Sequence, residues 1–191
     1  MDWIETQRQD TIRAFARASK PGGPHGKFGQ KKLKWQPMTN ANFILNVDDS
    51  YRERDKVAGG GAVLRDKHGN WIAGCARKFR AETPLEAEWK ALVMGMQWVK
   101  SKGYENCEIH IDSKEIADFM HAALTIGHHQ DTIMEHLKKM NIEGGCKIVH
   151  VYREQNQVAD ELAKLALCGE TDWIEFYKPL PDAEDGFAMT L

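Results

Sequence analysis

The chain of 191 residues, 42% of them hydrophobic, is long enough for one folded domain with its own core and additional tails. It holds no run of eighteen apolar residues, so the sequence predicts no membrane-spanning helix. The N-terminus reads Met-Asp-Trp-Ile-Glu and lacks the charged-then-apolar order of a secretory signal. We therefore expect an intracellular protein, nuclear or cytoplasmic, that is neither secreted nor bound to a membrane.

The four cysteines lie far apart in the sequence, with no Cys-x-x-Cys pair and no histidine at zinc-binding spacing. They are Cys75, Cys107, Cys146 and Cys168. This pattern favours reduced thiols in the core of a cytosolic or nuclear protein over disulfide bonds.

Charge is divided unevenly along the chain, although the net value is only −2. Residues 1–40 hold eight Lys and Arg against three Asp and Glu, a net charge of +5, which leaves −7 for the rest of the chain. A basic arm ahead of an acidic domain suits contact with a polyanion. A solvated linker explains the same composition equally well.

The sequence divides into four parts. Residues 1–18 have apolar side chains at loose helical spacing and predict a short amphipathic helix. Residues 19–34 are basic and rich in Gly and Pro, which is typical of a flexible linker. A folded domain is expected over residues 35–168, followed by an acidic, Pro-containing tail over residues 169–191, to which no function is assigned.

Five strands are predicted from short apolar runs bounded by turn residues. They cover residues 42–48, 59–64, 71–79, 108–112 and 147–152. The second strand begins with three glycines, which weaken a strand unless another backbone or a ligand must come close. A hairpin turn at residues 66–70 joins the second and third strands, so the first three strands are expected to form an antiparallel meander.

Four helices are predicted after the meander. They cover residues 83–102, 113–122, 131–140 and 156–167. Thr83 can cap the first of them, Pro84 is favoured at its first position, and Gly103 ends it. The order βββ-α-β-α-α-β-α predicts an α/β domain with a mixed five-stranded sheet, three antiparallel strands followed by two parallel strands, flanked by helices.

Four carboxylates occupy positions where burial is expected. Asp48 and Asp112 end the first and fourth strands, Asp160 lies in the first turn of the last helix, and Glu88 falls on the apolar stripe of the long helix. That stripe consists of Leu85, Leu92, Met96 and Val99. Each acid alone has an ordinary explanation, as a turn residue, a helix cap or an acid favoured by the helix dipole.

Two strand ends and two helix starts can, however, converge at one edge of a sheet. Four carboxylates held together repel one another and raise one another's pKa, a cost that two bound divalent cations would remove. Two such ions suit the attack of water on a phosphodiester, because one activates the water and the other stabilises the leaving oxygen. Since every ligand would be an oxygen atom, Mg²⁺ is expected, with Mn²⁺ able to substitute, rather than zinc.

Five short motifs in order resemble the ribonuclease H family. They read Asn46-Val47-Asp48-x-Ser50, Gly60-Gly61-Ala62-Val63-Leu64-Arg65-Asp66, Ala87-Glu88-x-x-Ala91-Leu92, Ile111-Asp112-Ser113 and Val158-Ala159-Asp160-x-Leu162-Ala163. The set covers about residues 41–168 and is most similar to the reverse-transcriptase-like ribonuclease H domains that are abundant in plants, many of them derived from retroelements.

The resemblance implies the ribonuclease H fold and magnesium-dependent, endonucleolytic cleavage of the RNA strand in RNA–DNA hybrids, without sequence specificity. By position it assigns metal binding and catalysis to Asp48, Glu88, Asp112 and Asp160. Further candidates for contact with the nucleic acid are Ser50, Gly60, Ser113 and Asn156. The expected partner is an RNA–DNA hybrid, and the chain is expected to be monomeric.

The chain departs from the family pattern at three places. Asp49 stands where the family usually has Gly, so it is either a spare ligand or a disturbance of the strand. The loop over residues 153–157 lacks the His that many active members carry there, and the nearby His150 is expected to be structural. The basic helix that some bacterial members use to grip hybrid is missing between Ala122 and Gly127.

Two classes of function therefore stay open. The first is an endonuclease that cuts hybrids, favoured by four intact acids. The second is a catalytically weak or inactive nucleic-acid-binding module of retroelement origin, favoured by Asp49 and by the missing loop His. A 3′–5′ exonuclease of the same superfamily is a more distant alternative, because it would want Asp-x-Glu where this chain reads Asp48-Asp49-Ser50.

Overall fold

A computed structural model describes residues 41–126, 146–170 and 172–179 of the chain. The predicted helices over residues 1–18 and 131–140, the linker over 19–34, and the predicted start of the domain at residue 35 lie outside the described residues. Within the described ranges, no helix is both long and apolar enough to cross a membrane.

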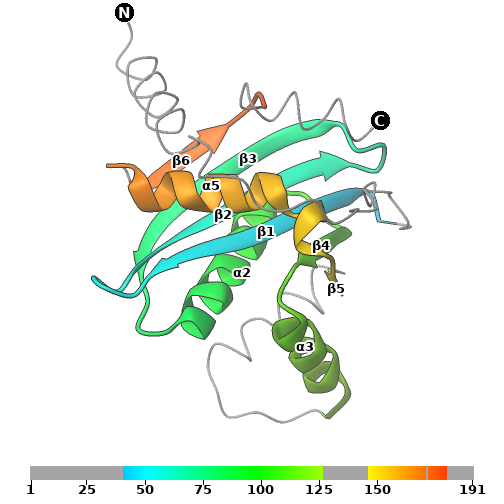
Figure 1. The fold of residues 1–191 in the computed structure, drawn as a ribbon. Coiled ribbons are helices and arrows are strands. Elements are labelled where there is room, and N and C mark those ends of the chain that lie inside the picture. Colours follow the sequence, from blue (N-terminus) through cyan, green and yellow to red (C-terminus); the bar gives the residue numbers. More distant parts are fainter. Residues whose placement is uncertain (1–40, 127–145, 171, 180–191) are drawn as a thin grey trace, which may run out of the picture.

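The domain is built on one mixed sheet with the strand order β5-β4-β1-β2-β3-β6 (Figure 1). Its strands are β1 (Phe43–Arg52), β2 (Val57–Asp66), β3 (Trp71–Arg80), β4 (Cys107–Ile111), β5 (Lys147–His150) and β6 (Trp173–Phe176). The first three form the predicted antiparallel meander. β4 runs parallel to β1, and β5 runs parallel to β4. The predicted α/β architecture is confirmed.

A sixth strand corrects the predicted count of five. β6 pairs antiparallel with the outer edge of β3, inside the region that the sequence suggested was an acidic tail. Phe176 and Ile174 pack in one apolar cluster with Val63 and Leu162, and this burial favours the pairing of the short strand with β3. The tail prediction missed it because the acidic neighbours of β6 obscured a four-residue apolar alternation.

Helices cover both faces of the sheet (Figure 1). They are α2 (Pro84–Ser101), α3 (Lys114–Ile126) and α5 (Gln157–Cys168), and a short 3₁₀ turn, η1 (Arg153–Gln155), precedes α5. α2 and α3 share the larger apolar core with one face of β1 and β4, and α5 lies across β1, β2 and β3 on the opposite face. The sheet is therefore covered by helices on both of its faces.

Two of the three glycines of β2 leave room for the backbone of α5, which packs directly against the strand. A Cβ added at Gly59 would lie 2.1 Å from the carbonyl oxygen of Ala163, and one added at Gly61 would lie 2.2 Å from that of Ala159. Gly60 faces the other side, where an added Cβ would meet the Phe79 ring at 3.0 Å. The predicted close approach of another backbone is confirmed at two of the three glycines.

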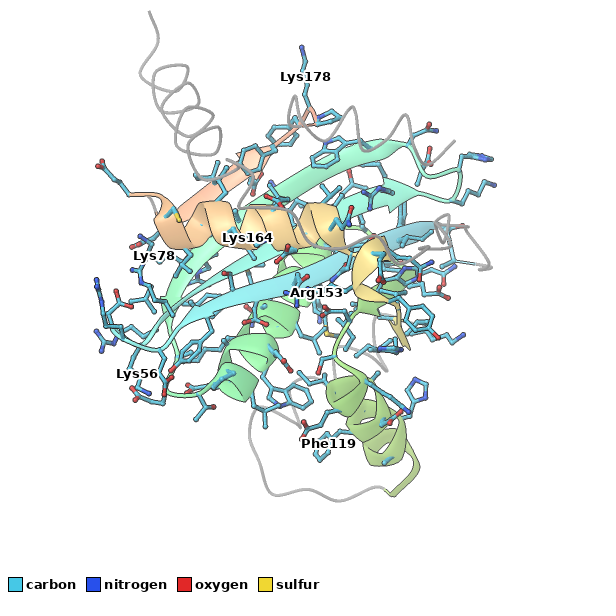
Figure 2. All side chains as sticks on the ribbon, in the orientation of Figure 1. Lys56, Lys78, Phe119, Arg153, Lys164 and Lys178 are labelled. Carbon is cyan, nitrogen blue, oxygen red and sulfur yellow. The ribbon has the colours of Figure 1, made fainter. Side chains whose placement is uncertain are left out.

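Helix α2 begins where the sequence predicts, but the residue that its first turn buries is not the predicted one. The Thr83 hydroxyl accepts a hydrogen bond from the Glu86 N–H at 3.1 Å, with Pro84 at the first position. Leu85, predicted on the buried stripe, is 41% exposed, and Ala87 takes the buried place in the first turn. Leu85 lines a surface groove together with Phe119, which Figure 2 labels on α3.

All four cysteines are free thiols, as predicted. Cys75 and Cys107 are buried in the core, whereas Cys146 is half-buried and Cys168 is exposed, so the predicted core location holds for two of the four. Burial raises the pKa of the Cys75 thiol above its ordinary range.

Candidate active site

The acids gather where β1 and β4 separate. The parallel pairing of these strands ends at Asn46 with His110, so the chain beyond that point diverges and leaves room between them. Asp112 follows the last residue of β4. The expectation that Asp48 ends the first strand is wrong: β1 continues to Arg52, because its antiparallel pairing with β2 extends that far. Asp48 is nevertheless the second residue beyond the end of the β4 pairing.

A small cavity of about 20 Å³ opens at this divergence. Asp48, Asp49, Glu88 and Asp112 all contribute to its lining. The fourth predicted acid, Asp160, does not line it. Three of the four predicted acids therefore share one cavity with Asp49, for which a spare ligand was one of the two predicted alternatives.

Asp160 approaches the group from the first turn of α5 and is only 9% exposed. The Lys164 ammonium donates to its carboxylate at 2.5 Å, one helical turn away. The Arg153 guanidinium lies 3.9 Å from Asp160 and 4.0 Å from Asp112, so it bridges two of the acids from η1. Figure 2 labels both cations, Arg153 and Lys164.

The two adjacent aspartates of β1 point to opposite faces of the sheet. Asp48 pairs with Gly61, the residue that α5 presses against, so Asp48 lies on the α5 face. Alternation then places Asp49 on the α2 face, towards Glu88. The register is regular through Asp49, so the alternative that Asp49 disturbs the strand is not supported.

Burial and mutual repulsion strongly perturb these carboxyl groups. Burial, followed by the charge of Asp112, raises the pKa of Asp48 to about 8, although the backbone N–H of Asp49 opposes the rise. Burial, followed by the charges of Glu88 and Asp112, raises the pKa of Asp49 to about 7. Burial also raises the pKa of Glu88, against a hydrogen bond from Ser113. Such a site favours added positive charge.

Hydrogen bonds hold two of the acids, Asp48 and Glu88, in place. Asp48 accepts from the Asp49 backbone N–H at 2.8 Å and from the Asn156 side-chain amide at 3.2 Å. Glu88 accepts from the Ser113 hydroxyl at 2.8 Å. These contacts engage both oxygens of Asp48 and one oxygen of Glu88, and both residues line the cavity where β1 and β4 diverge.

The donor set fits a hard divalent cation. Every candidate ligand is a carboxylate oxygen, the donor type that Mg²⁺ and Mn²⁺ prefer. Within the described ranges, no three His, Cys, Asp or Glu side chains already converge tightly enough to form a finished metal site. The chemistry of the donors therefore fits the cation, and binding would draw oxygens together against the repulsion described above.

The four predicted nucleic-acid contacts fall in different places. Ser50 is half-buried on β1, and Gly60 is buried beneath Phe79. Ser113 supports Glu88. Asn156 is 1% exposed, and its side-chain amide forms hydrogen bonds inside the protein. Contact of these four residues with nucleic acid stays a prediction.

Sequence reasoning missed the polar residues that support the acids. Asn46 and Arg65 are buried among apolar strand residues, and a polar side chain at a buried alternation position was the signal that could have found Asn46. Arg153 stands in the loop where the family pattern has a His, but its proximity to two acids was not foreseen. His150 ends β5, exposed, with its ring against Tyr152.

A family model described as reverse transcriptase-like matches residues 46–166, which contain all four predicted acids. This chain belongs to the reverse transcriptase-like family. The predicted family is therefore confirmed, and the match covers the strands and helices that build the acid group.

Relatives of this reverse transcriptase-like chain include ribonuclease H proteins. A protein of Arabidopsis thaliana named "Putative ribonuclease H protein" is 29% identical over 141 residues, which are 72% of this chain but 22% of that protein. The chain thus spans about a fifth of this relative.

Solved structures show the same fold. The LC11 ribonuclease H1 in complex with an RNA/DNA hybrid matches with a TM-score of 0.56 and 24% identity, over 65% of this chain and 96% of that chain. Ribonuclease H1 of Halobacterium salinarum matches with a TM-score of 0.55, 24% identity and the same coverage. The predicted ribonuclease H-like fold is confirmed.

Proposed function

We propose that this chain hydrolyses the RNA strand of RNA–DNA hybrids as an endonuclease, with Asp48, Glu88, Asp112 and Asp160 holding two divalent cations. The observation that carries the proposal is the convergence of carboxylates from two strands and two helices where β1 and β4 diverge. Packing alone does not account for it, because burial and mutual repulsion raise the pKa of Asp48 to about 8.

Bound Mg²⁺ ions would supply the positive charge that activates water and stabilises the leaving oxygen. The chain's own residues do the rest. Asp48 and Asp112 present oxygens from neighbouring strands, Ser113 orients Glu88, and Arg153 stands at the exposed rim, where it can meet a phosphate. We expect Mn²⁺ to substitute, because the same oxygen donors suit both ions.

The choice of an RNA–DNA hybrid as substrate is supported by family membership. The ribonuclease H1 neighbour described above was solved with an RNA/DNA hybrid, and its fold is shared by this chain. Recognition by shape and by 2′-hydroxyl groups needs few base contacts, which is consistent with cleavage that is not sequence-specific. Action as a monomer inside the cell remains a prediction.

A second candidate function is a binding module that cuts hybrids weakly or not at all. Asp49 favours it, because a fifth carboxylate lines the same cavity as Glu88 and Asp112 and changes the charge that any cation would meet. The two candidates differ in turnover and share hybrid binding, so one experiment separates them.

The test is cleavage of an end-labelled RNA–DNA hybrid with Mg²⁺ and then with Mn²⁺, beside the Asp112→Asn variant. We expect internal cuts in the RNA strand by the parent chain and a loss of at least about a hundredfold in the variant. Asp112→Asn keeps the size of the side chain, so its melting curve serves as the folding control. Hybrid binding without cleavage in either metal would instead establish the binding module.

A further inference from the structure

A line of buried polar side chains runs from β2 to the acid group on the α5 face of the sheet. The Arg65 guanidinium donates to the Asn46 side-chain oxygen at 2.8 Å. The Asn46 side-chain NH₂ donates to the Asn156 side-chain oxygen at 3.0 Å. The Asn156 NH₂ donates to Asp48 at 3.2 Å and to the backbone oxygen of Val47 at 2.8 Å.

These groups are held away from water by the fold itself. Asn46 and Asn156 are each 1% exposed, and Arg65 is 8% exposed. Arg65 follows a shift in the register of β2 with β3, which lies between Leu64 and Arg65. Burial lowers the pKa of the guanidinium to about 10, so Arg65 stays charged at neutral pH. A buried charge of this kind is costly unless its donors are matched.

The guanidinium also fixes the direction of every hydrogen bond in the line. Arg carries donors and no acceptor, so Asn46 must turn its oxygen towards Arg65 and its NH₂ towards Asn156. Asn156 must then turn its own oxygen towards Asn46, which leaves its NH₂ for Asp48. The Val47 carbonyl oxygen accepts from the same NH₂, and together the two constraints keep the Asn156 amide from rotating by half a turn and facing the carboxylate with an oxygen, which would repel it.

Asn156 also reaches a second acid through its backbone. Its carbonyl oxygen accepts from the N–H groups of Ala159 and Asp160, both at 3.1 Å, and so starts α5. One residue therefore connects the β1 acid, through its side chain, with the helix acid, through its main chain. A displacement of the Asn156 backbone would therefore affect both acids, whereas a rotation of its side-chain amide would affect Asp48.

We propose that Arg65 and Asn46 are positioning residues, which orient the Asn156 amide as a donor and so fix the Asp48 carboxylate for cation binding. Neither touches the acid itself. The proposal rests on the proposed function for its consequence in catalysis, while the hydrogen-bonded line can be tested without catalysis. Groups that orient metal ligands from behind commonly change metal affinity or activity by about ten- to a hundredfold when they are replaced.

The decisive variant is Asn46→Asp. The new carboxylate still accepts from Arg65, so the buried cation keeps its partner, but it can no longer donate to Asn156. Asn106→Asp is the matched control, since Asn106 is exposed at the opposite end of β4 from Asp112. Two further variants separate the charge of Arg65 from its packing. Arg65→Met keeps a long side chain but has no charge and no donor, whereas Arg65→Lys keeps a positive charge with donors.

The first readout is hydrogen exchange of the Asn156 side-chain NH₂, measured by NMR without metal. We expect slow exchange in the parent chain and in Asn106→Asp, at least tenfold faster exchange in Asn46→Asp and Arg65→Met, and partial recovery in Arg65→Lys. Unchanged exchange in Asn46→Asp and Arg65→Met would overturn the proposal.

The second readout is Mn²⁺ affinity by titration, with kcat and KM for hybrid cleavage. We expect about tenfold weaker Mn²⁺ binding and a lower kcat in Asn46→Asp, with KM for the hybrid unchanged. Parent-like Mn²⁺ affinity and kcat in that variant would refute the positioning role. A parent chain that neither binds Mn²⁺ nor cuts hybrid would defeat the proposed function, and the exchange experiment would still decide the hydrogen-bonded line.

Discussion

The two faces of the sheet are packed in different ways, and the acid group lies where they meet. On the α2 face, large apolar side chains such as Val47 and Leu92 fill the space between helix and sheet. On the α5 face, Gly61 has no Cβ, so the backbone of Ala159 can pack directly against β2. Buried polar side chains lie on the same face. The α2 face holds the larger apolar core, whereas the α5 face combines a smaller apolar cluster with close backbone contact and directed hydrogen bonds.

This difference assigns separate tasks to the two faces. Apolar side chains tolerate small shifts, because dispersion contacts have no preferred direction. Hydrogen bonds from amides and a guanidinium do have direction, so the α5 face can hold Asp48 in one orientation. Both faces bury apolar side chains that stabilise the fold, and the α5 face adds directed hydrogen bonds that orient the Asp48 carboxylate.

The largest expected effect comes from placing a side chain in the close contact between the β2 and α5 backbones. In Gly61→Ala the added Cβ would meet backbone atoms of α5, which cannot rotate away, and we expect a loss of about 3 kcal/mol or more in the free energy of unfolding. Gly60→Ala is the matched control, because its Cβ meets the side chains of Phe79 and Met94, which can give way, at about 1 kcal/mol. Urea unfolding of both proteins measures the contrast, and equal losses would contradict the assigned difference between the faces.

A smaller effect of opposite sign is expected for Asp48→Asn. Because the folded pKa of Asp48 is about 8 and its ordinary value is 3.8, the folded chain binds the extra proton more tightly than the unfolded chain. The contribution of Asp48 to stability is therefore present below about pH 4 and is lost as pH rises towards 8. The amide removes this loss, so at pH 8 without metal we expect a gain of at least about 1 kcal/mol, or about 2–4 °C in melting temperature.

Melting curves of the parent chain and Asp48→Asn at pH 5 and pH 8, with EDTA, make this measurement. The parent should gain stability between pH 8 and pH 5, and the variant should gain less. A variant that melts below the parent at pH 8 would show that Asp48 is an ordinary stabilising partner in the fold.

The smallest expected effect belongs to Asp49→Asn on the α2 face. Asp49 lines the cavity with Glu88 and Asp112, so the loss of its charge should weaken Mn²⁺ binding by about 1 kcal/mol, or roughly fivefold. Exposed Asp172 provides the control as Asp172→Asn, which should leave the Mn²⁺ affinity unchanged. Tighter Mn²⁺ binding after Asp49→Asn would mean that the fifth carboxylate hinders the site.

The sequence alone predicted five of the six described strands, the helices α2, α3 and α5 and the order of these elements, and it singled out the four acids as candidates. Apolar alternation and helical spacing report which face of its own element a residue occupies, and Thr83 with Pro84 marks a helix start through contacts within one turn. These signals are local, so they survive without knowledge of the partner elements.

Tertiary structure decided what each face meets. Leu85 fits the apolar stripe of α2 yet is 41% exposed, because it lines a surface groove with Phe119 and lies outside the core. The line from Arg65 through Asn46 to Asn156 joins residues about a hundred positions apart, and only the packing of η1 and α5 against β1 brings them together. A hydrogen bond depends on distance and direction in space, and neither is written in the spacing of residues along the chain.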